Sequence, residues 1–164
     1  MIRFTEHSVV FAEIPGHIAL AINVSGCAYR CKGCHSPHLQ QDVGEDLEQM
    51  LPRLLDTYAQ YVDVVCFLGE GNDALALAKC VRMCKRNGLM TALYSGADTE
   101  AGVPALSLLQ PGELDFLKLG PYMEDKGPLN VPTTNQRLYR LSPDGPTDIT
   151  HLLWKESSSH ERLD

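Results

Sequence analysis

The sequence predicts an α/β fold: an incomplete (βα) half-barrel with mostly parallel strands and a C-terminal hairpin. Short apolar runs of strand length alternate along the chain with segments of helical periodicity, which is typical of parallel βαβ units. A Pro-Asp-Gly turn near the end of the chain lies between two apolar segments, as expected for a hairpin. The length of 164 residues is enough for one domain and too short for two.

The first strands and the first helix lie on either side of a cysteine-rich segment. Residues 18–24 form an apolar run of strand length, and residues 9–11 are expected to pair with it as an antiparallel edge. Further along, Asp42 and Glu45 form a capping-box pattern, and apolar residues then recur at helical spacing. An amphipathic helix is therefore expected over about residues 44–60.

Three more strands alternate with two more helices. The strands are expected at residues 62–68, 89–94 and 114–119. Asn72 is a favourable N-cap for the helix after the first of them, and Gly88 lies where that helix should stop. A short helix is expected to start near Pro104, and Pro52 predicts a kink in the preceding long helix. Strands joined in this way are parallel and are wound right-handedly.

The remainder of the chain is irregular before it pairs again. Residues 121–136 contain Gly and Pro without periodicity, and long irregular loops of this kind usually form lids or docking surfaces. Residues 137–141 and 149–154 are expected to form the closing hairpin around Pro143-Asp144-Gly145. The expected domain and flexible tail are residues 1–155 and 156–164.

Charge and hydropathy exclude two classes of partner. Fourteen basic side chains against 21 acidic ones give a net charge of −7, which opposes the counterion release that drives nucleic-acid binding. No apolar run approaches the length of a membrane span, and residues 1–10 do not resemble a signal peptide. We therefore expect a cytoplasmic protein that binds neither nucleic acid nor a membrane.

Three of the six cysteines form a compact set. Cys27, Cys31 and Cys34 lie within eight residues, and Gly26 and Gly33 allow the backbone to wrap closely around a bound group. Three protein sulfurs on a 4Fe-4S cluster would leave one iron free to bind a substrate or a cofactor. The spacing of the cysteines favours such a cluster.

Two alternatives to the cluster remain open. A structural zinc ion could be held by the three cysteines together with His35 or His38, although structural zinc ligands usually come as two separated pairs. The loop could also bind no metal. The other cysteines, Cys66, Cys80 and Cys84, lie in apolar patterns and are expected to pack in the core.

The expected topology places this set at a ligand-binding position. In parallel α/β folds, ligands bind at the carboxyl ends of the strands, where the loops converge. The loops that follow the four parallel strands begin at Ser25, Gly69, Ser95 and Gly120. The cysteines lie in the first of these loops, so the other three are expected to surround the same site.

The cysteine spacing C-x3-C-x2-C at the end of the first parallel strand resembles that of the radical S-adenosylmethionine (SAM) enzymes. Three segments taken together narrow the resemblance to one subgroup of these enzymes. They are Val24 to His35, Lys118-Leu-Gly-Pro-Tyr-Met-Glu124, and Pro132-Thr-Thr-Asn-Gln-Arg-Leu-Tyr139. Over about residues 8–141 the chain resembles the anaerobic ribonucleoside-triphosphate reductase-activating proteins.

The resemblance implies a half-barrel of the radical SAM type and a glycyl-radical activase, an oxidoreductase. Cys27, Cys31 and Cys34 would hold the 4Fe-4S cluster, and the amino and carboxylate groups of SAM would chelate its fourth iron. An electron from a donor such as flavodoxin would then cleave SAM to methionine and a 5′-deoxyadenosyl radical. The protein substrate would be the anaerobic reductase, from whose backbone glycine that radical takes a hydrogen atom.

The resemblance also implies roles for residues outside the metal set. Gly33, Cys34 and His35 match the part of the family loop that lies along the adenosyl group. Gly69 and Glu70 match the family's Gly-Gly-Glu-Pro type segment, which receives the SAM amino group. Without the resemblance, Glu70 could equally be a solvated acid near the start of a helix.

Two further residues are assigned to SAM, and two depart from the family pattern. Ser95 matches a family hydroxyl that could reach the methionyl end of SAM, although a simple turn at the end of a strand explains it equally well. Lys118 could meet the SAM carboxylate, or it could face solvent. Leu68 and Gly71 depart from the Gly-Gly-Glu-Pro pattern, which puts the local backbone path in doubt.

Two rival functions remain open at this stage. An activase of another glycyl-radical enzyme, of the formate-lyase type, would share every feature of the cysteine loop. A non-enzymatic zinc-binding module would use the same cysteines as a structural staple.

Overall fold

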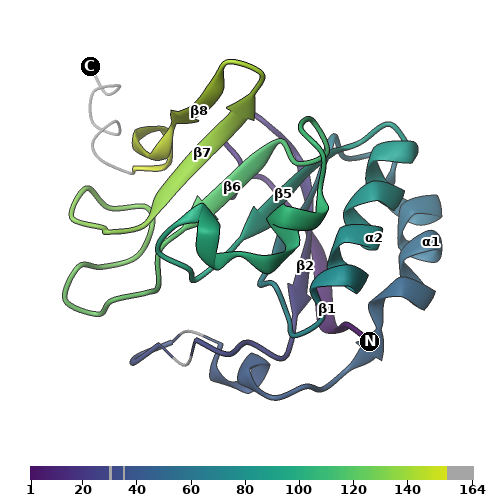
Figure 1. Cartoon of the computed structure of the whole chain (residues 1–164), viewed down its shortest axis with the longest axis horizontal. Helices are drawn as coiled ribbons and strands as arrows, with labels where there is room; N and C mark the ends of the chain where they lie inside the picture. Colours follow the sequence, from purple (N-terminus) through teal and green to yellow (C-terminus); the bar gives the residue numbers. More distant parts are fainter. Residues whose placement is uncertain (30, 35, 155–164) are drawn as a thin grey trace, which may run out of the picture.

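The computed structural model describes residues 1–29, 31–34 and 36–154 (Figure 1). The tail expected at residues 156–164 and the candidate site residue His35 lie outside the described residues. None of the helices in the described part has the length and apolar character needed to cross a membrane.

One mixed sheet organises the chain, with α-helices on one side of it. The strands are β1 (Arg3–Val10), β2 (Ala19–Val24), β3 (Glu45–Asp46), β4 (Val64–Leu68), β5 (Met90–Tyr94), β6 (Phe116–Leu119), β7 (Arg137–Ser142) and β8 (Gly145–Asp148). Their order is β3-β1-β2-β4-β5-β6-β7-β8, and the sheet is open, with β3 and β8 at its edges. The neighbours β2, β4, β5 and β6 are parallel, which confirms the predicted α/β class.

The two α-helices cover the same face of the sheet. Helices α1 (Leu47–Tyr58) and α2 (Ala74–Arg86) lie side by side in Figure 1. Their buried leucines, valine and cysteines pack against side chains such as Phe67, Leu93 and Leu117 from the central strands. A smaller apolar cluster occupies the opposite face, and it includes Ile14 from the β1–β2 loop and Ile149 from the end of the described chain.

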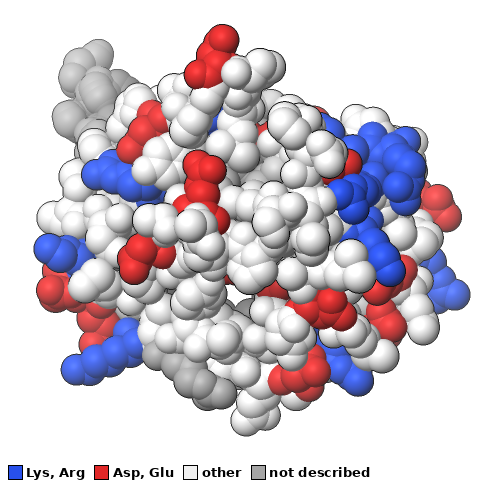
Figure 2. Space-filling model, viewed as in Figure 1, with Lys and Arg blue, Asp and Glu red and all other residues white. Residues whose placement is uncertain are grey.

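Basic side chains gather near the helices. On the face shown in Figure 2, Lys and Arg are concentrated toward α1 and α2, while Asp and Glu are spread over the remainder. Two basic residues of α2 form ion pairs with the segment that leads into β6: Arg82 with Glu113 (3.0 Å) and Lys85 with Asp115 (2.7 Å). The positive charge on this side is therefore partly neutralised.

The predicted helix starts are wrong by one or more residues. Helix α1 is capped by Asp46, whose carboxylate accepts hydrogen bonds from the amides of Glu48 and Gln49 (3.0 and 3.4 Å), and not by the capping box of Asp42 and Glu45. The reason is strand pairing: residues 45 and 46 are held extended against β1, so the helix cannot begin before residue 47.

The start of α2 also differs from expectation, and α1 continues through Pro52. Asp73 caps α2 through the amide of Ala76 (3.0 Å), whereas the side chain of Asn72 lies against Gly26. Pro52 lies on the exposed face of α1 and does not end the helix, which is continuous from Leu47 to Tyr58.

Two later elements are shorter than predicted. The helix expected near Pro104 is the 3-10 helix η3 (Pro104–Leu108), and a second 3-10 helix, η2 (Glu100–Gly102), precedes it; the two are separated at Val103, where the following proline disfavours the α conformation. The hairpin is present, but its second arm is β8, since pairing resumes at Gly145 directly after a two-residue turn. The segment predicted as that arm contains instead a 3-10 helix, η4 (Thr150–Leu153).

Candidate functional site

One row of side chains across the parallel strands forms the floor of a cavity. Asn23, Leu68, Tyr94 and Lys118 are paired in register across β2, β4, β5 and β6. All four line a cavity of about 470 Å³ at the carboxyl ends of these strands. Because side chains alternate along a strand, the adjacent residues Phe67, Leu93 and Leu117 face the helices instead. Two residues nearer the starts of the strands, the side chains on the same face are mostly small. They are Ala21, Cys66, Ala92 and Phe116.

The cysteine loop, residues 25–44, borders this cavity and is closed at its base. The amide of Gly26 donates to the carbonyl of Gln41 (3.0 Å), and that of Cys27 donates to Leu39 (2.9 Å). Figure 1 shows the loop running past the carboxyl end of β2 before it leads into α1. The two ends of the loop are therefore paired: Cys27 lies at this paired base, and Cys31 and Cys34 lie on the part beyond it.

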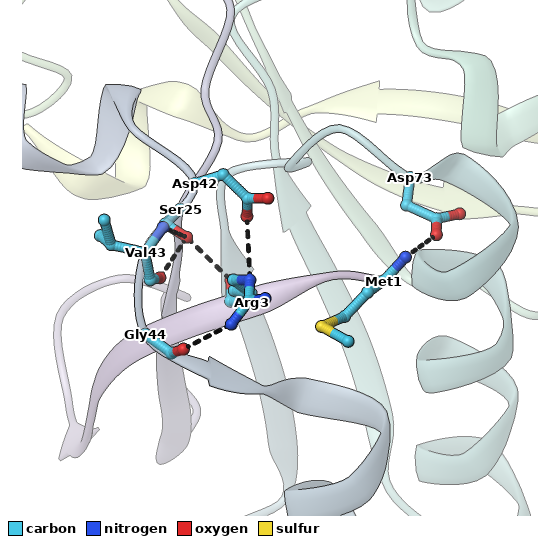
Figure 3. A network of polar contacts seen from close by, with 7 residues as sticks. All are labelled: Met1, Arg3, Ser25, Asp42, Val43, Gly44 and Asp73. Carbon is cyan, nitrogen blue, oxygen red and sulfur yellow. Dashed lines mark hydrogen bonds and ion pairs between the residues drawn. The ribbon is translucent and has the colours of Figure 1, made fainter.

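A buried serine and an arginine fasten the loop ends to β1 (Figure 3). The hydroxyl of Ser25, which is fully buried, donates to the carbonyl of Val43 (2.6 Å) and accepts from the amide of the same residue (3.1 Å). The guanidinium of Arg3 donates to the carbonyl of Gly44 (3.1 Å) and lies 3.7 Å from the carboxylate of Asp42. These contacts fix where the loop leaves the sheet and where it returns.

The three loop cysteines line the same cavity. Cys27, Cys31 and Cys34 are partly buried free thiols, and they also border a smaller adjoining hollow of about 110 Å³. Within the described residues, no three His, Cys, Asp or Glu side chains are arranged to hold a single metal ion. Three thiols that border one space are the kind of donor set that a 4Fe-4S cluster uses, since its thiolates bind three separate irons.

The other three cysteines belong to the core, as predicted. Cys66, Cys80 and Cys84 are completely buried. Burial raises the pKa of the Cys80 and Cys84 thiols to about 12 and raises the pKa of Cys66 still further. These thiols remain protonated at neutral pH and are poor ligands and poor nucleophiles.

Lys118 is a buried cation beside the cavity, so the alternative that it faces solvent is wrong. Its side chain is 8% exposed, and its ammonium donates to the carbonyl of Gly120 (3.0 Å) and to the amide oxygen of Gln136 (2.9 Å). Nζ also lies 5.7 Å from the centre of the Tyr94 ring. Burial lowers the pKa of Lys118 to about 8, against the opposing effect of the Cys31 and Cys27 sulfurs. A buried cation whose described hydrogen-bond partners are neutral favours an anionic group in the cavity.

Glu70 does not line the cavity itself but contacts two residues that do, Tyr29 and Ser95. Its Oε2 accepts hydrogen bonds from the hydroxyl of Tyr29 (2.7 Å) and from the hydroxyl of Ser95. The carboxylate borders a different hollow, of about 300 Å³, at the start of α2. Burial and the contact with Glu70 raise the pKa of Tyr29 to about 12, so its hydroxyl remains a donor at neutral pH. Glu70 thus links the cysteine loop to the end of β5.

The structure brings most of the predicted site residues together. Six of them line the one cavity: Cys27, Cys31, Cys34, Gly69, Ser95 and Lys118. Gly33 instead lies against Glu124, and a Cβ at this position, where φ is +74°, would be 2.4 Å from that side chain. The predicted contact of Gly33 with an adenosyl group would therefore be made by its backbone.

Several cavity residues were missed by the sequence analysis. Asn23 and Tyr94 could have been found from alternation, because each holds the same position in its strand as Lys118 does in β6. Gln136 could not, because it returns to the cavity at the end of an irregular loop. Glu13 lines the cavity from the β1–β2 loop, where its carbonyl accepts from the Tyr94 hydroxyl (2.6 Å).

The cavity combines three sulfur donors with one buried cation at the open ends of four parallel strands. Soft thiolate ligands select iron–sulfur clusters, zinc or copper(I), and the cation suits the carboxylate or phosphate of an organic molecule. The site can therefore hold a soft metal centre beside an anionic ligand. In comparisons with known proteins, no protein-family model, curated protein or solved structure matches the chain significantly.

Proposed function

We propose that the chain is a radical SAM activase, with the described sheet as the half-barrel of that type. It reductively cleaves SAM at a 4Fe-4S cluster held by Cys27, Cys31 and Cys34, and it generates a glycyl radical on anaerobic ribonucleoside-triphosphate reductase. The observation that carries the proposal is that these cysteines and Lys118 line one cavity at the carboxyl ends of the parallel strands. The sequence resemblance supports the choice of reaction and of partner.

The residues of the cavity supply binding and orientation. When bound, the cluster supplies the electron that cleaves the sulfonium of SAM, so no side chain need act as an acid or a base. Lys118 binds the SAM carboxylate through a charge-assisted hydrogen bond. Gly69 lines the cavity, and its φ of +113° together with the Val24 carbonyl, 3.1 Å from a would-be Cβ, requires glycine at this position.

The carboxylate of Glu70, which would receive the SAM amino group, already accepts hydrogen bonds from two other side chains of the protein. Glu70 is held by Tyr29 and Ser95, so an ammonium group could bind this carboxylate only by sharing or replacing those hydrogen bonds. Gly69, unlike Glu70, lines the cavity.

The proposal predicts reductive cleavage of SAM. Protein reconstituted with iron and sulfide under anaerobic conditions should produce 5′-deoxyadenosine when dithionite and SAM are added, measured by chromatography. Cys31→Ala should abolish the product, because a lost thiolate leaves the cluster incompletely held. Cys80→Ala, which removes a buried core thiol instead, is the matched control and should retain the activity.

The outcomes separate the proposed reaction from its rivals. A Cys31→Ala variant that cleaves SAM at the normal rate would contradict the assignment. Protein that carries one zinc ion, no sulfide and no colour would support the zinc module. To identify the partner, active protein and a one-electron donor such as flavodoxin are mixed with the anaerobic reductase or with a formate-lyase-type enzyme. Electron paramagnetic resonance then shows which of the two acquires the glycyl radical.

A further inference from the structure

We infer that Tyr29 is a positioning residue: it fastens the middle of the cysteine loop to the rim of the sheet and so holds Cys27 and Cys31 toward the cavity. Two independent contacts carry the inference, one made by the hydroxyl and one by the ring. The inference concerns where the loop is held, whichever group the cysteines bind, so it stands or falls separately from the proposed function.

The hydroxyl contact joins the loop to two strands at once. The Tyr29 hydroxyl donates to Glu70, which directly follows Gly69 at the end of β4. The same carboxylate oxygen accepts from Ser95 at the end of β5, and the Ser95 oxygen in turn accepts from the amide of Ala97 (2.9 Å). Ser95 is 1% exposed, so this end of the anchor is buried directly after β5. Glu70 is thus a fixed acceptor for the loop.

The contact made by the Tyr29 ring explains why residue 96 is a glycine. A Cβ built on Gly96 would lie 2.8 Å from two carbons of the Tyr29 ring, closer than real Cβ contacts allow. Gly96 does not have the positive φ that would by itself require glycine. The residue is therefore needed here for close packing of the ring, and an alanine at this position would push Tyr29 away without straining the backbone.

The position of Tyr29 in the loop determines which cysteines its contacts hold in place. Ser25, Gly26 and Cys27 fasten the base of the loop through backbone and hydroxyl hydrogen bonds, and Gly33 lies against Glu124 further out. Tyr29 is two residues from Cys27 and two from Cys31. Releasing Tyr29 should therefore loosen the segment that carries these two thiols and leave the sheet and its core intact.

Site-resolved alkylation of the cysteines tests the inference on the reduced, metal-free full chain. Iodoacetamide is added in limiting pulses, and peptide mass spectrometry gives a rate for each cysteine. Because a hydrogen bond to a charged group is lost in a partly exposed position, Tyr29→Phe should speed alkylation of Cys27 and Cys31 by roughly two- to fivefold. Gly96→Ala should do the same in the wild-type background and should add nothing in a Tyr29→Ala background, where there is no ring to displace.

Internal and matched controls separate positioning from loss of fold. The buried thiols Cys66, Cys80 and Cys84 should stay unreactive in every variant, whereas a destabilised protein would expose them as well. Tyr61→Phe alters an exposed tyrosine outside the loop, so it should leave all rates unchanged. Unchanged rates at Cys27 and Cys31 in Tyr29→Phe, or an equal effect of Gly96→Ala with and without the ring, would overturn the inference.

Discussion

Lys118 shows how one buried residue can set the chemistry of a cavity. It holds its charge in a site that is largely removed from water, and its described hydrogen-bond partners are a carbonyl and an amide. Neutral acceptors compensate a buried charge only in part, so an anionic group that enters the cavity gains a strong contact without first breaking an ion pair.

Replacement of Lys118 should weaken SAM binding. In the reconstituted protein, Lys118→Met should lower the affinity for SAM by about 10- to 100-fold, which corresponds to the ~1.5–3 kcal/mol of a hydrogen bond to a charged group. The pKa of about 8 adds a second signature: the lysine loses its charge as the pH rises through 8, so the affinity of the wild-type protein should fall over that interval. Isothermal titration between pH 6.5 and 9.5 measures both effects.

The variant itself is the control for titration of the ligand. SAM has its own ionisable amino group, and its effect is common to both proteins, so the difference between the two pH profiles belongs to Lys118. Equal affinities at low pH, or profiles that run parallel throughout, would show that Lys118 does not bind the carboxylate.

At the scale of elements, the cysteine loop is held as a closed unit. Its ends are paired with each other and tied to β1, so the position of the cysteines depends on the strand at the start of the chain. Ser25 is central to this closure because its one hydroxyl serves both the amide and the carbonyl of Val43.

Removal of that hydroxyl should open the base of the loop. Ser25→Ala leaves the partly buried amide and carbonyl of Val43 without this partner, which should cost about 0.5–1.5 kcal/mol. Hydrogen exchange at the amides of Gly26 and Cys27 should accelerate, while that of α2 should not change. Ser142→Ala removes an exposed hydroxyl that donates to Gly145 in the β7–β8 turn, and it should leave the cysteine loop protected. Unchanged exchange at Gly26 in Ser25→Ala would contradict this view of the loop.

Strands were easier to predict from the sequence than the segments that join them. The parallel strands are buried on both faces and therefore read as continuous apolar runs, as in residues 62–68, which contain β4. The caps were misplaced because the choice among neighbouring Asp, Asn and Glu residues is made by tertiary contacts: β1 holds residues 45 and 46 extended, and Asn72 lies over Gly26. Neither contact leaves a local pattern in the sequence.

The site could be predicted only as far as topology determines it. That the cysteines, Gly69, Ser95 and Lys118 meet follows from parallel strands whose carboxyl ends lie at one edge. The engagement of Glu70 by Tyr29 depends on how the loop folds back, and the contribution of Gln136 depends on the path of an aperiodic loop. Such contacts have no periodic signal in the sequence.

At the scale of the whole molecule, the two faces of the sheet are covered differently. Two α-helices and a large apolar cluster cover one face, while the β1–β2 loop and the end of the described chain cover the other with a smaller cluster. Stability thus resides mainly on the helical face, which leaves the other face free to form a cavity.

The central claim is that the three loop cysteines hold a 4Fe-4S cluster in that cavity. The most direct test is the iron and acid-labile sulfide content of protein purified without oxygen, together with its visible spectrum. The account predicts four irons and four sulfides per chain with broad iron–sulfur absorption, and loss of all three signals when Cys27, Cys31 and Cys34 are replaced by alanine. A single zinc ion without sulfide, or full iron and sulfide retained in the triple variant, would contradict it.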